Sequence, residues 1–373
     1  MSISKRGGSW RARYYGPDGR QRSKSFKRKS DAERWLAQQH AQMTKGDWID
    51  PARGRITFGE YAPCWLETRT SAKPKTRHQQ ASLLRLHILP AWRTVQLDRI
   101  TFEDLTRWVV DLAAGGLGPS GIRQSVYLMS AILEHAVRSG RIRSNPARGL
   151  ALPRARRRDH VFLTHGQLAE LADVAGGWRL LVLVLGYTGL RWGEATALRV
   201  CDIDFMRRRV DVRRAFSDVG GKIVLGTPKS HLARTVPLPR FLAADLAASV
   251  EGKNPDDLVF TTVSGSIVRS ANWRQKVFLP ARKQAGVSDR FRIHDLRHTA
   301  AALMIQAGYP PKMLQEILGH ASITTTLDLY GHLYPGDMDK YADRLGDAAE
   351  DAADASDKAK TRPDDEEDDP DES

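Results

Sequence analysis

Three groups of histidine, arginine and tyrosine residues lie close together late in the chain. Residues 294–298 read His-Asp-Leu-Arg-His, residues 318–320 read Leu-Gly-His, and residues 330–332 read Tyr-Gly-His. Phosphodiester exchange needs a nucleophile, positive charge that complements the oxygens of the transition state, and an acid for the leaving oxygen. A cation-rich pocket beside an exposed phenol could therefore break and rejoin a DNA backbone without a metal or a nucleotide.

Two arginines are the candidates for gripping the phosphate. A guanidinium offers paired N–H groups to two nonbridging oxygens, which a lysine does less well. Arg191 follows a Gly-Leu turn and opens a predicted helix, and Arg297 shares a helix face with His294, three residues earlier. Taken alone, Arg191 also fits a surface charge. Glu194 is expected to brace Arg191 and to do no chemistry.

Tyr330 is the candidate nucleophile. A phenol that attacks phosphorus forms a phosphotyrosyl ester, which keeps the bond energy and can be reversed by a returning hydroxyl. Tyr330 lies ten residues after His320, and a Thr-Thr-Thr run precedes it. Because most tyrosines serve packing, two rivals are kept: Tyr334 within reach and Tyr309 at a greater distance.

These motifs, together with Thr-Gly-Leu-Arg-Trp-Gly-Glu at 188–194 and Thr-Pro-Lys at 227–229, resemble the tyrosine recombinase family. Their order and register are similar to those of its phage-type integrases, over most of the chain. The resemblance implies a catalytic set made of Arg191, Lys229, His294, Arg297, His320 and Tyr330. Glu194 and His298 would support this set. His298 is expected either behind the reacting groups or, preferably, in the hydrophobic core.

The resemblance also implies a role for each residue of the set. Lys229, on a turn between two strands, would protonate the leaving 5′ oxygen, although a solvated hairpin lysine is the alternative. His294 would act as general base or phosphate ligand, and His320 would donate a hydrogen bond to a nonbridging oxygen. The family's nucleophile precedes Gly/Ser-His, which favours Tyr330 over Tyr334.

The function implied by the resemblance is site-specific DNA recombination that integrates or excises a phage or another mobile element. Four protomers would assemble on two double-stranded attachment sites, form a 3′-phosphotyrosyl link and pass through a Holliday junction. The ester keeps the bond energy, so no cofactor is expected. A DNA-bending host factor and an excision factor are the expected accessory partners.

Three other classes compete with this interpretation. The His-x-x-x-His spacing of 294–298 is that of a zinc helix. However, the arginine between the histidines would repel a dication, and no third ligand is evident. A type IB topoisomerase would share the chemistry but relax supercoils as a monomer. A DNA-binding regulator without catalytic activity would form no covalent adduct.

Charge and composition point to a nucleic-acid partner. The whole chain has a net charge of +14. Residues 347–373 hold 13 acidic and three basic residues, a balance of −10, so residues 1–346 carry +24. Such an excess is typical of proteins that neutralise phosphates, and simple solubility does not require it. Cys64 and Cys201 form neither a zinc motif nor a disulfide framework. With no signal peptide or membrane-length apolar run, a cytoplasmic, nucleoid-associated protein is expected.

The sequence predicts a multidomain α+β chain whose first domain binds arm-type DNA sites. Residues 1–50 should form a small sheet backed by a helix that runs to about Met43. Basic residues on one face of this sheet would enter a major groove, although a solvated hairpin is the alternative. The predicted contacts are Arg11, Arg13, Arg20, Arg22 and Lys24.

The remaining domains are predicted as a helical core-binding domain (56–150), a basic linker (151–159), a mixed α/β catalytic domain (160–346) and a disordered acidic tail (347–373). The helical domain would contact DNA through residues that include Lys75, Arg77 and Arg123. One of its helices is expected to end at Pro90. In the catalytic domain, residues 209–216, 222–225 and 235–238 are expected to form one antiparallel sheet.

Overall fold

The computed structural model describes residues 1–46, 48–50, 52–154, 160–228, 233–334 and 338–360. The chain divides into two compact units, one made of Met1–Asp159 with Asp218–Ile223 and the other of the remaining residues. No helix among the described residues combines the length and apolar character that a membrane crossing requires.

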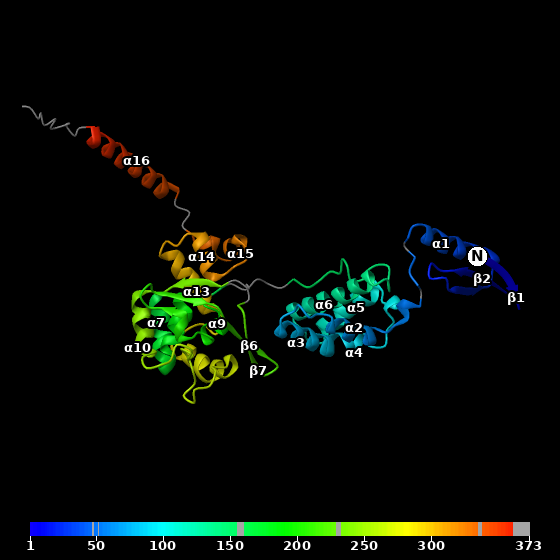
Figure 1. The fold of residues 1–373 in the computed structure, drawn as a ribbon, viewed down its shortest axis with the longest axis horizontal. Helices are drawn as coiled ribbons and strands as arrows, with labels where there is room; N and C mark the ends of the chain where they lie inside the picture. Colours follow the sequence, from blue (N-terminus) through cyan, green and yellow to red (C-terminus); the bar gives the residue numbers. More distant parts are fainter. Residues whose placement is uncertain (47, 51, 155–159, 229–232, 335–337, 361–373) are drawn as a thin grey trace, which may run out of the picture. The chain divides into compact units, whose positions relative to one another are not determined.

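The first unit begins with an antiparallel sheet in the order β1-β2-β3, packed against one helix (Figure 1). The elements are β1 (Ser2–Arg6), β2 (Ser9–Tyr15), β3 (Gln21–Phe26) and α1 (Lys29–Thr44). Ala12 and Tyr14 point to one face and form a small core with Ala32 and Leu36 of the helix. Side chains alternate along a strand, so the arginines at 11 and 13 lie on the opposite face.

The expectation that the basic residues of this sheet share one face is wrong. The β2–β3 register pairs Tyr14 with Arg22 and Ala12 with Lys24, and directly paired residues share a face. Arg22 and Lys24 therefore lie on the helix side. Arg22 is ion-paired there with Asp18 and with Asp50, each at 2.7 Å.

A helical bundle with a separate core forms the rest of the first unit (Figure 1). It comprises α2 (Phe58–Glu67), α3 (Pro74–Leu83), α4 (Leu89–Trp92), α5 (Phe102–Ala114) and α6 (Pro119–Arg138). The prediction of a helix end at Pro90 is wrong. A π-helical turn over Leu84–Ile88 joins α3 to α4, and Pro90 falls in the first turn of α4, where its missing N–H costs nothing.

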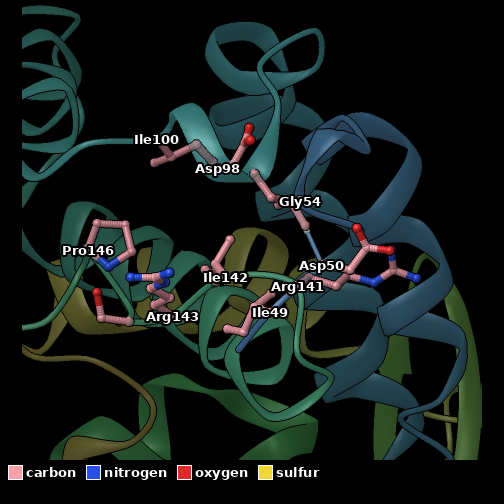
Figure 2. A pocket seen from close by; sticks show the side chains of 11 residues that line it. Ile49, Asp50, Gly54, Asp98, Ile100, Arg141, Ile142, Arg143 and Pro146 are labelled. Carbon is pink, nitrogen blue, oxygen red and sulfur yellow. The ribbon is translucent and has the colours of Figure 1, made fainter. Parts of the chain in front are cut away.

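One cavity of the first unit, of about 350 Å³, lies where the chain enters the bundle (Figure 2). Its lining includes Asp50, Asp98, Arg141 and Arg143 but none of the predicted catalytic residues. The cavity is therefore separate from the chemistry predicted for the second unit.

The second unit is mainly helical, with small sheets (Figure 1). Its helices are α7 (His165–Val174), α8 (Arg179–Thr188), α9 (Trp192–Thr196), α10 (Arg240–Ser249), α11 (Ser270–Trp273), α12 (Leu279–Gln284), α13 (Asp295–Gln306), α14 (Pro311–Leu318), α15 (Ile323–Tyr330) and α16 (Met338–Lys360). The strands are β4 (Ile203–Asp204), β5 (Arg209–Val212), β6 (Ala215–Val219), β7 (Lys222–Gly226) and β8 (Arg234–Pro237), except that the end of β6 and the start of β7, within Asp218–Ile223, are counted with the first unit. The apolar α8 is buried almost throughout. One core joins α8, α13 and α14 to the sheet, and this core fixes the elements that carry the motifs.

The predicted sheet of 209–216, 222–225 and 235–238 is wrong in its pairing. The three-stranded sheet has the order β4-β5-β8, and β6 pairs with β7 in a separate hairpin. The chain leaves the sheet after β5, where Arg214 forms an ion pair with the buried Asp202 at 2.7 Å. The two-residue strand β4 is too short to be recognised from alternation.

The prediction that the whole tail is disordered is also wrong. Helix α16 continues through residues 347–360, and residues 361–373 lie outside the described part of the chain. This segment is rich in alanine, the residue with the highest helix propensity, so it can form a helix without a core to pack against.

Gly193 in α9 provides a test of the packing beside Arg191. A Cβ atom at Gly193 would lie 2.2 Å from the carbonyl oxygen of Phe216, so Gly193→Ala must displace backbone. We expect a loss of about 1–3 kcal/mol in the free energy of unfolding. The matched control is Gly166→Ala in α7, where a Cβ meets nothing within 4 Å and helix propensity favours alanine. Equal urea midpoints for the two variants would contradict this packing.

Candidate active site

The turn between α8 and α9 places Arg191. Gly189 ends α8 with a φ of 65°, a left-handed conformation that glycine adopts without strain. Arg191 is the residue immediately before α9, as predicted, and Glu194 lies in the first turn of that helix. The Arg191 backbone N–H and Nη1 donate to the two carboxylate oxygens of Glu194, each at 2.9 Å.

Glu194 is buried between two arginines. Arg234, from the start of β8, donates from Nη1 to Oε1 at 3.0 Å and from Nη2 to Oε2 at 2.6 Å. The side chains of Glu194 and Arg234 are 1% and 7% exposed, whereas that of Arg191 is 23% exposed. Burial opposes ionisation of Glu194, but Arg234 and Arg191 outweigh it and lower its pKa to about 2.

Three arginines converge on the carboxyl end of α14. Arg234 Nε donates to the carbonyl oxygen of Ile317 at 2.6 Å, Arg297 Nη2 donates to that of Leu318, and Arg191 Nη2 reaches that of Gly319 at 3.5 Å. Three successive carbonyls at a helix end thus receive guanidinium donors. Such carbonyls have no partner inside the helix and carry partial negative charge, so cations there are favourable.

Arg297 lies deepest in this cluster. It is 3% exposed, and its Nη1 donates to the carbonyl oxygen of Gly189, so the side chain ties the end of α8 to the end of α14. Burial, together with the charges of Arg191 and Arg234, lowers the pKa of Arg297 to about 9. The side chain therefore remains cationic at neutral pH.

His320 follows the α14 terminus and faces the same cluster. Its Nδ1 is hydrogen-bonded to Thr326 Oγ1 at 2.9 Å. Burial, then the charges of Arg297 and Arg191, lowers the pKa of His320 to about 4. The ring is therefore neutral at physiological pH, and it keeps one N–H donor.

Tyr330, at the end of α15, is 0% exposed, so the expectation of an exposed phenol is wrong. Its ring packs in the core, and its hydroxyl is hydrogen-bonded to His298 Nδ1 at 2.7 Å. Burial raises the pKa of Tyr330 to about 12, and burial is also the main cause that lowers the pKa of His298 to about 3. His298 is thus buried, as expected, and also contacts the candidate nucleophile.

The structure also describes the two rival tyrosines and His294. The Tyr334 hydroxyl donates to the backbone carbonyl oxygen of Tyr309 at 3.3 Å. His294 is exposed and immediately precedes α13, and its ring centroid lies 5.2 Å from that of His298. Lys229 lies outside the described residues.

The predicted DNA contacts comprise four residues on the strands of the N-terminal sheet and four elsewhere. On the sheet, Arg11 and Arg13 occupy the open face and hydrogen-bond to Ser23 and Ser4, while Arg22 and Lys24 lie on the helix side. The other four predicted residues lie in a turn or on helices. Arg20, Lys75 and Arg77 are exposed, and Arg123 is half-buried.

One group of described residues has the donor types and spacing that could hold a metal ion: His160, Asp295 and His298, whose candidate ligand atoms lie within 4.8 Å of one another. The zinc-helix pair of His294 and His298 is not this group. Because His298 already engages Tyr330 and Arg297 places positive charge beside it, the donor set suits a dication poorly.

Sequence reasoning missed Arg234. It stands alone among threonine and apolar residues at the start of a strand, and its pattern is that of an ordinary edge charge. The available signal was its position five residues after Lys229, but only the fold brings it to Glu194.

The buried His298 and the half-buried His320 make stability depend on pH. The folded pKa values of His298 and His320, about 3 and about 4, lie below the ordinary value of about 6.5. As pH falls below about 6.5, the unfolded chain takes up protons that the folded chain does not, so stability is full above that pH and is lost below it. We expect His298→Gln to flatten the fall in urea-unfolding free energy between pH 7.5 and 5. Parallel curves for wild type and variant would contradict this.

Models of three protein domains match the chain. The phage integrase family model matches residues 162–336, its N-terminal domain matches residues 4–45, and its N-terminal SAM-like domain matches residues 57–113. The arginine cluster and Tyr330 of the second unit fall in the first of these matches.

Relatives and solved structures agree with these matches. The chain is 34% identical to a putative prophage phiRv2 integrase of Mycobacterium tuberculosis over 92% of its own length and 94% of the relative's. Its fold is similar to that of the Tn1549 transposon integrase bound to transposon right end DNA, with a TM-score of 0.68, 22% identity, and coverage of 78% of this chain and 100% of that one. It is also similar to lambda integrase in a tetramer bound to a Holliday junction, with a TM-score of 0.57, 18% identity, and coverage of 86% and 96%. The chain therefore belongs to the phage integrase family, and it is a tyrosine-type site-specific DNA recombinase.

Proposed function

We propose that the cluster around the end of α14 is the site at which this recombinase cleaves and rejoins DNA, with Tyr330 as nucleophile. The observation that carries the proposal is the convergence of Arg191, Arg297 and His320 on one helix end beside a buried tyrosine. Together they supply the cations, a neutral donor and a phenol, the groups that metal-free phosphoryl transfer requires.

The two arginines divide the work of binding the phosphate. Arg191 is half-buried and its bond to the Gly319 carbonyl is long, at 3.5 Å, so its Nη2 is the donor most readily transferred to a nonbridging oxygen. Arg297 donates to two backbone carbonyls and adds positive charge from a buried position. Arg191 is the direct phosphate ligand in this proposal, and Arg297 fixes its surroundings.

His320 supplies a neutral hydrogen-bond donor. When the Thr326 hydroxyl donates to Nδ1, the ring N–H is on Nε2, and this tautomer is the one that donates to the phosphate in the proposal. Because the ring remains neutral down to about pH 4, it donates without adding a fourth full charge to a crowded site. His294, exposed at the start of α13, is the proposed general base or phosphate ligand, and Lys229 the proposed acid for the 5′ oxygen.

Tyr330 must move before it can react. A hydroxyl that is 0% exposed and bonded to His298 cannot reach a phosphate outside the protein. Cleavage therefore requires the end of α15 to shift and the hydrogen bond to His298 to break. In the attack, the Tyr330 hydroxyl gives its proton to the proposed base His294, and its oxygen bonds to phosphorus as the bond from phosphorus to the 5′ oxygen breaks. The product is a 3′-phosphotyrosyl ester, and the leaving 5′ oxygen takes a proton from the proposed acid Lys229 to become a free hydroxyl.

The proposed substrate is double-stranded DNA at two attachment sites, joined by a homo-tetramer through a Holliday junction so that a mobile element is integrated or excised. The charge of +24 over residues 1–346 supports DNA as the substrate. Lambda integrase has been solved as a tetramer on a Holliday junction and the Tn1549 enzyme on DNA, which supports the same assembly here. A DNA-bending host factor and an excision factor are the proposed accessory partners.

Tyr330→Phe is the direct test of the nucleophile. The protein is incubated, in the presence of a chelator, with nicked duplexes from the DNA that flanks its gene, and covalent adducts are resolved on a denaturing gel. We expect an adduct with wild type and none with Tyr330→Phe, because only the hydroxyl is removed, while duplex binding is unchanged.

Tyr334→Phe is the matched control and should form the adduct normally. An adduct that persists in Tyr330→Phe and disappears in Tyr334→Phe would move the nucleophile. Adduct formation that is lost only when chelator is added would point to a required metal.

Deletion of residues 1–50 tests the arm role. The small core of this segment is separate from the core of the helical bundle, so the rest of the chain should fold without it. We expect normal binding to the core site in gel-shift assays and loss of integration in a two-site assay. Full integration by the shortened protein would remove the arm-binding role.

A further inference from the structure

We infer that Arg234 is a positioning residue for strand cleavage: it neutralises Glu194 and holds the end of α14, so that Arg191 is presented to the phosphate. This inference rests on the proposed active site. The Arg234 side chain is 7% exposed, and its three guanidinium nitrogens donate to Glu194 and to the carbonyl oxygen of Ile317, so it acts through these neighbours.

The first step concerns the charge of Glu194. One carboxylate lies between two guanidiniums, and Arg234 takes both of its oxygens in a two-pronged contact at 3.0 and 2.6 Å. Arg191 contacts it through one side-chain nitrogen at 2.9 Å. With the carboxylate charge matched by Arg234, the charge of Arg191 is left to act on the phosphate. Without Arg234, the Glu194 carboxylate would keep Arg191 as its one guanidinium partner and would bind that side chain more strongly.

The second step concerns the helix end. Arg234 Nε donates to the Ile317 carbonyl at 2.6 Å, and a Cβ built on Gly319 would lie 3.0 Å from Arg234 Cδ. Arg234 therefore covers the left-handed Gly319 that ends α14 and sets the path into His320. The Arg234 side chain thus fixes the surroundings of Arg191 and of His320.

The third step concerns rigidity. Arg234 begins β8, where it pairs with Val212 of β5 in the three-stranded sheet. The sheet supplies a fixed backbone for a planar side chain that donates three hydrogen bonds in different directions. A lysine could keep the charge but not the fork or the Nε donor, so Arg234→Lys should lose most of the effect.

The experiment compares full-length wild type with Arg234→Met, Arg234→Lys, Glu194→Gln and the double variant Arg234→Met/Glu194→Gln. The rate constant for adduct formation on the nicked duplex is measured at saturating protein, so that DNA affinity does not limit it. We expect Arg234→Met to be slower by a factor of about 100, the order seen when one preorganised charge contact is lost. Arg234→Lys should fall between it and wild type.

Rescue is the decisive outcome. If Arg234 acts by neutralising Glu194, replacing that carboxylate with the neutral glutamine should release Arg191, and the double variant should be at least about tenfold faster than Arg234→Met. A merely structural role predicts the reverse, since two packing defects add. The matched control is Arg179→Met, which removes an exposed arginine paired with Asp173 and should leave the rate unchanged.

Thermal unfolding of the same proteins separates this inference from the proposed function. We expect the midpoint shifts of Arg234→Met and Glu194→Gln to be non-additive, because the two residues form one buried pair. Additive shifts, a wild-type rate in Arg234→Met, or a double variant slower than both single variants would each overturn the inference. A wild type that forms no adduct would overturn the proposed function instead, and the unfolding cycle would still decide whether Arg234 and Glu194 act as a pair.

Discussion

The catalytic unit depends on how the carboxyl end of α14 is satisfied. The final carbonyls of a helix lack intrahelical partners, and those of Ile317, Leu318 and Gly319 end a helix packed in the core. Arginines donate to all three. The partial negative charge of the helix end and the carboxylate of Glu194 together allow three guanidiniums to share a small volume. The cations of the proposed active site are thus gathered by the same contacts that hold the fold together.

This arrangement means that the DNA-free protein keeps its reactive groups engaged internally. The donors of Arg191 and Arg297 satisfy protein acceptors, and the Tyr330 hydroxyl is paired with His298. A hydrogen bond to a charged group contributes about 1.5–3 kcal/mol, so each exchange of a protein acceptor for a phosphate oxygen is nearly balanced. With such a balance, the phosphate of bound DNA can take over these donors in the proposed mechanism.

The sequence was sufficient for features that depend on local patterns. The helix that runs to about Met43, the start of α9 after Arg191 and the helical character of residues 56–150 follow from spacing and residue type. It was insufficient where distant segments meet. The role of Arg234 depends on β8 lying beside α14, and the burial of Tyr330 depends on where α15 packs. The pairing of β5 with β8 joins segments separated by the β6–β7 hairpin, which strand alternation alone does not reveal.

The central question is which side chain forms the covalent link to DNA. The covalent adduct formed by wild-type protein should be trapped, digested with nuclease and trypsin, and its modified peptide sequenced by tandem mass spectrometry. Residues 313–340 form one tryptic peptide that contains both Tyr330 and Tyr334, so fragment ions distinguish the two. The account predicts a nucleotide on Tyr330 alone. A nucleotide on Tyr334, or on any residue outside this peptide, would contradict it.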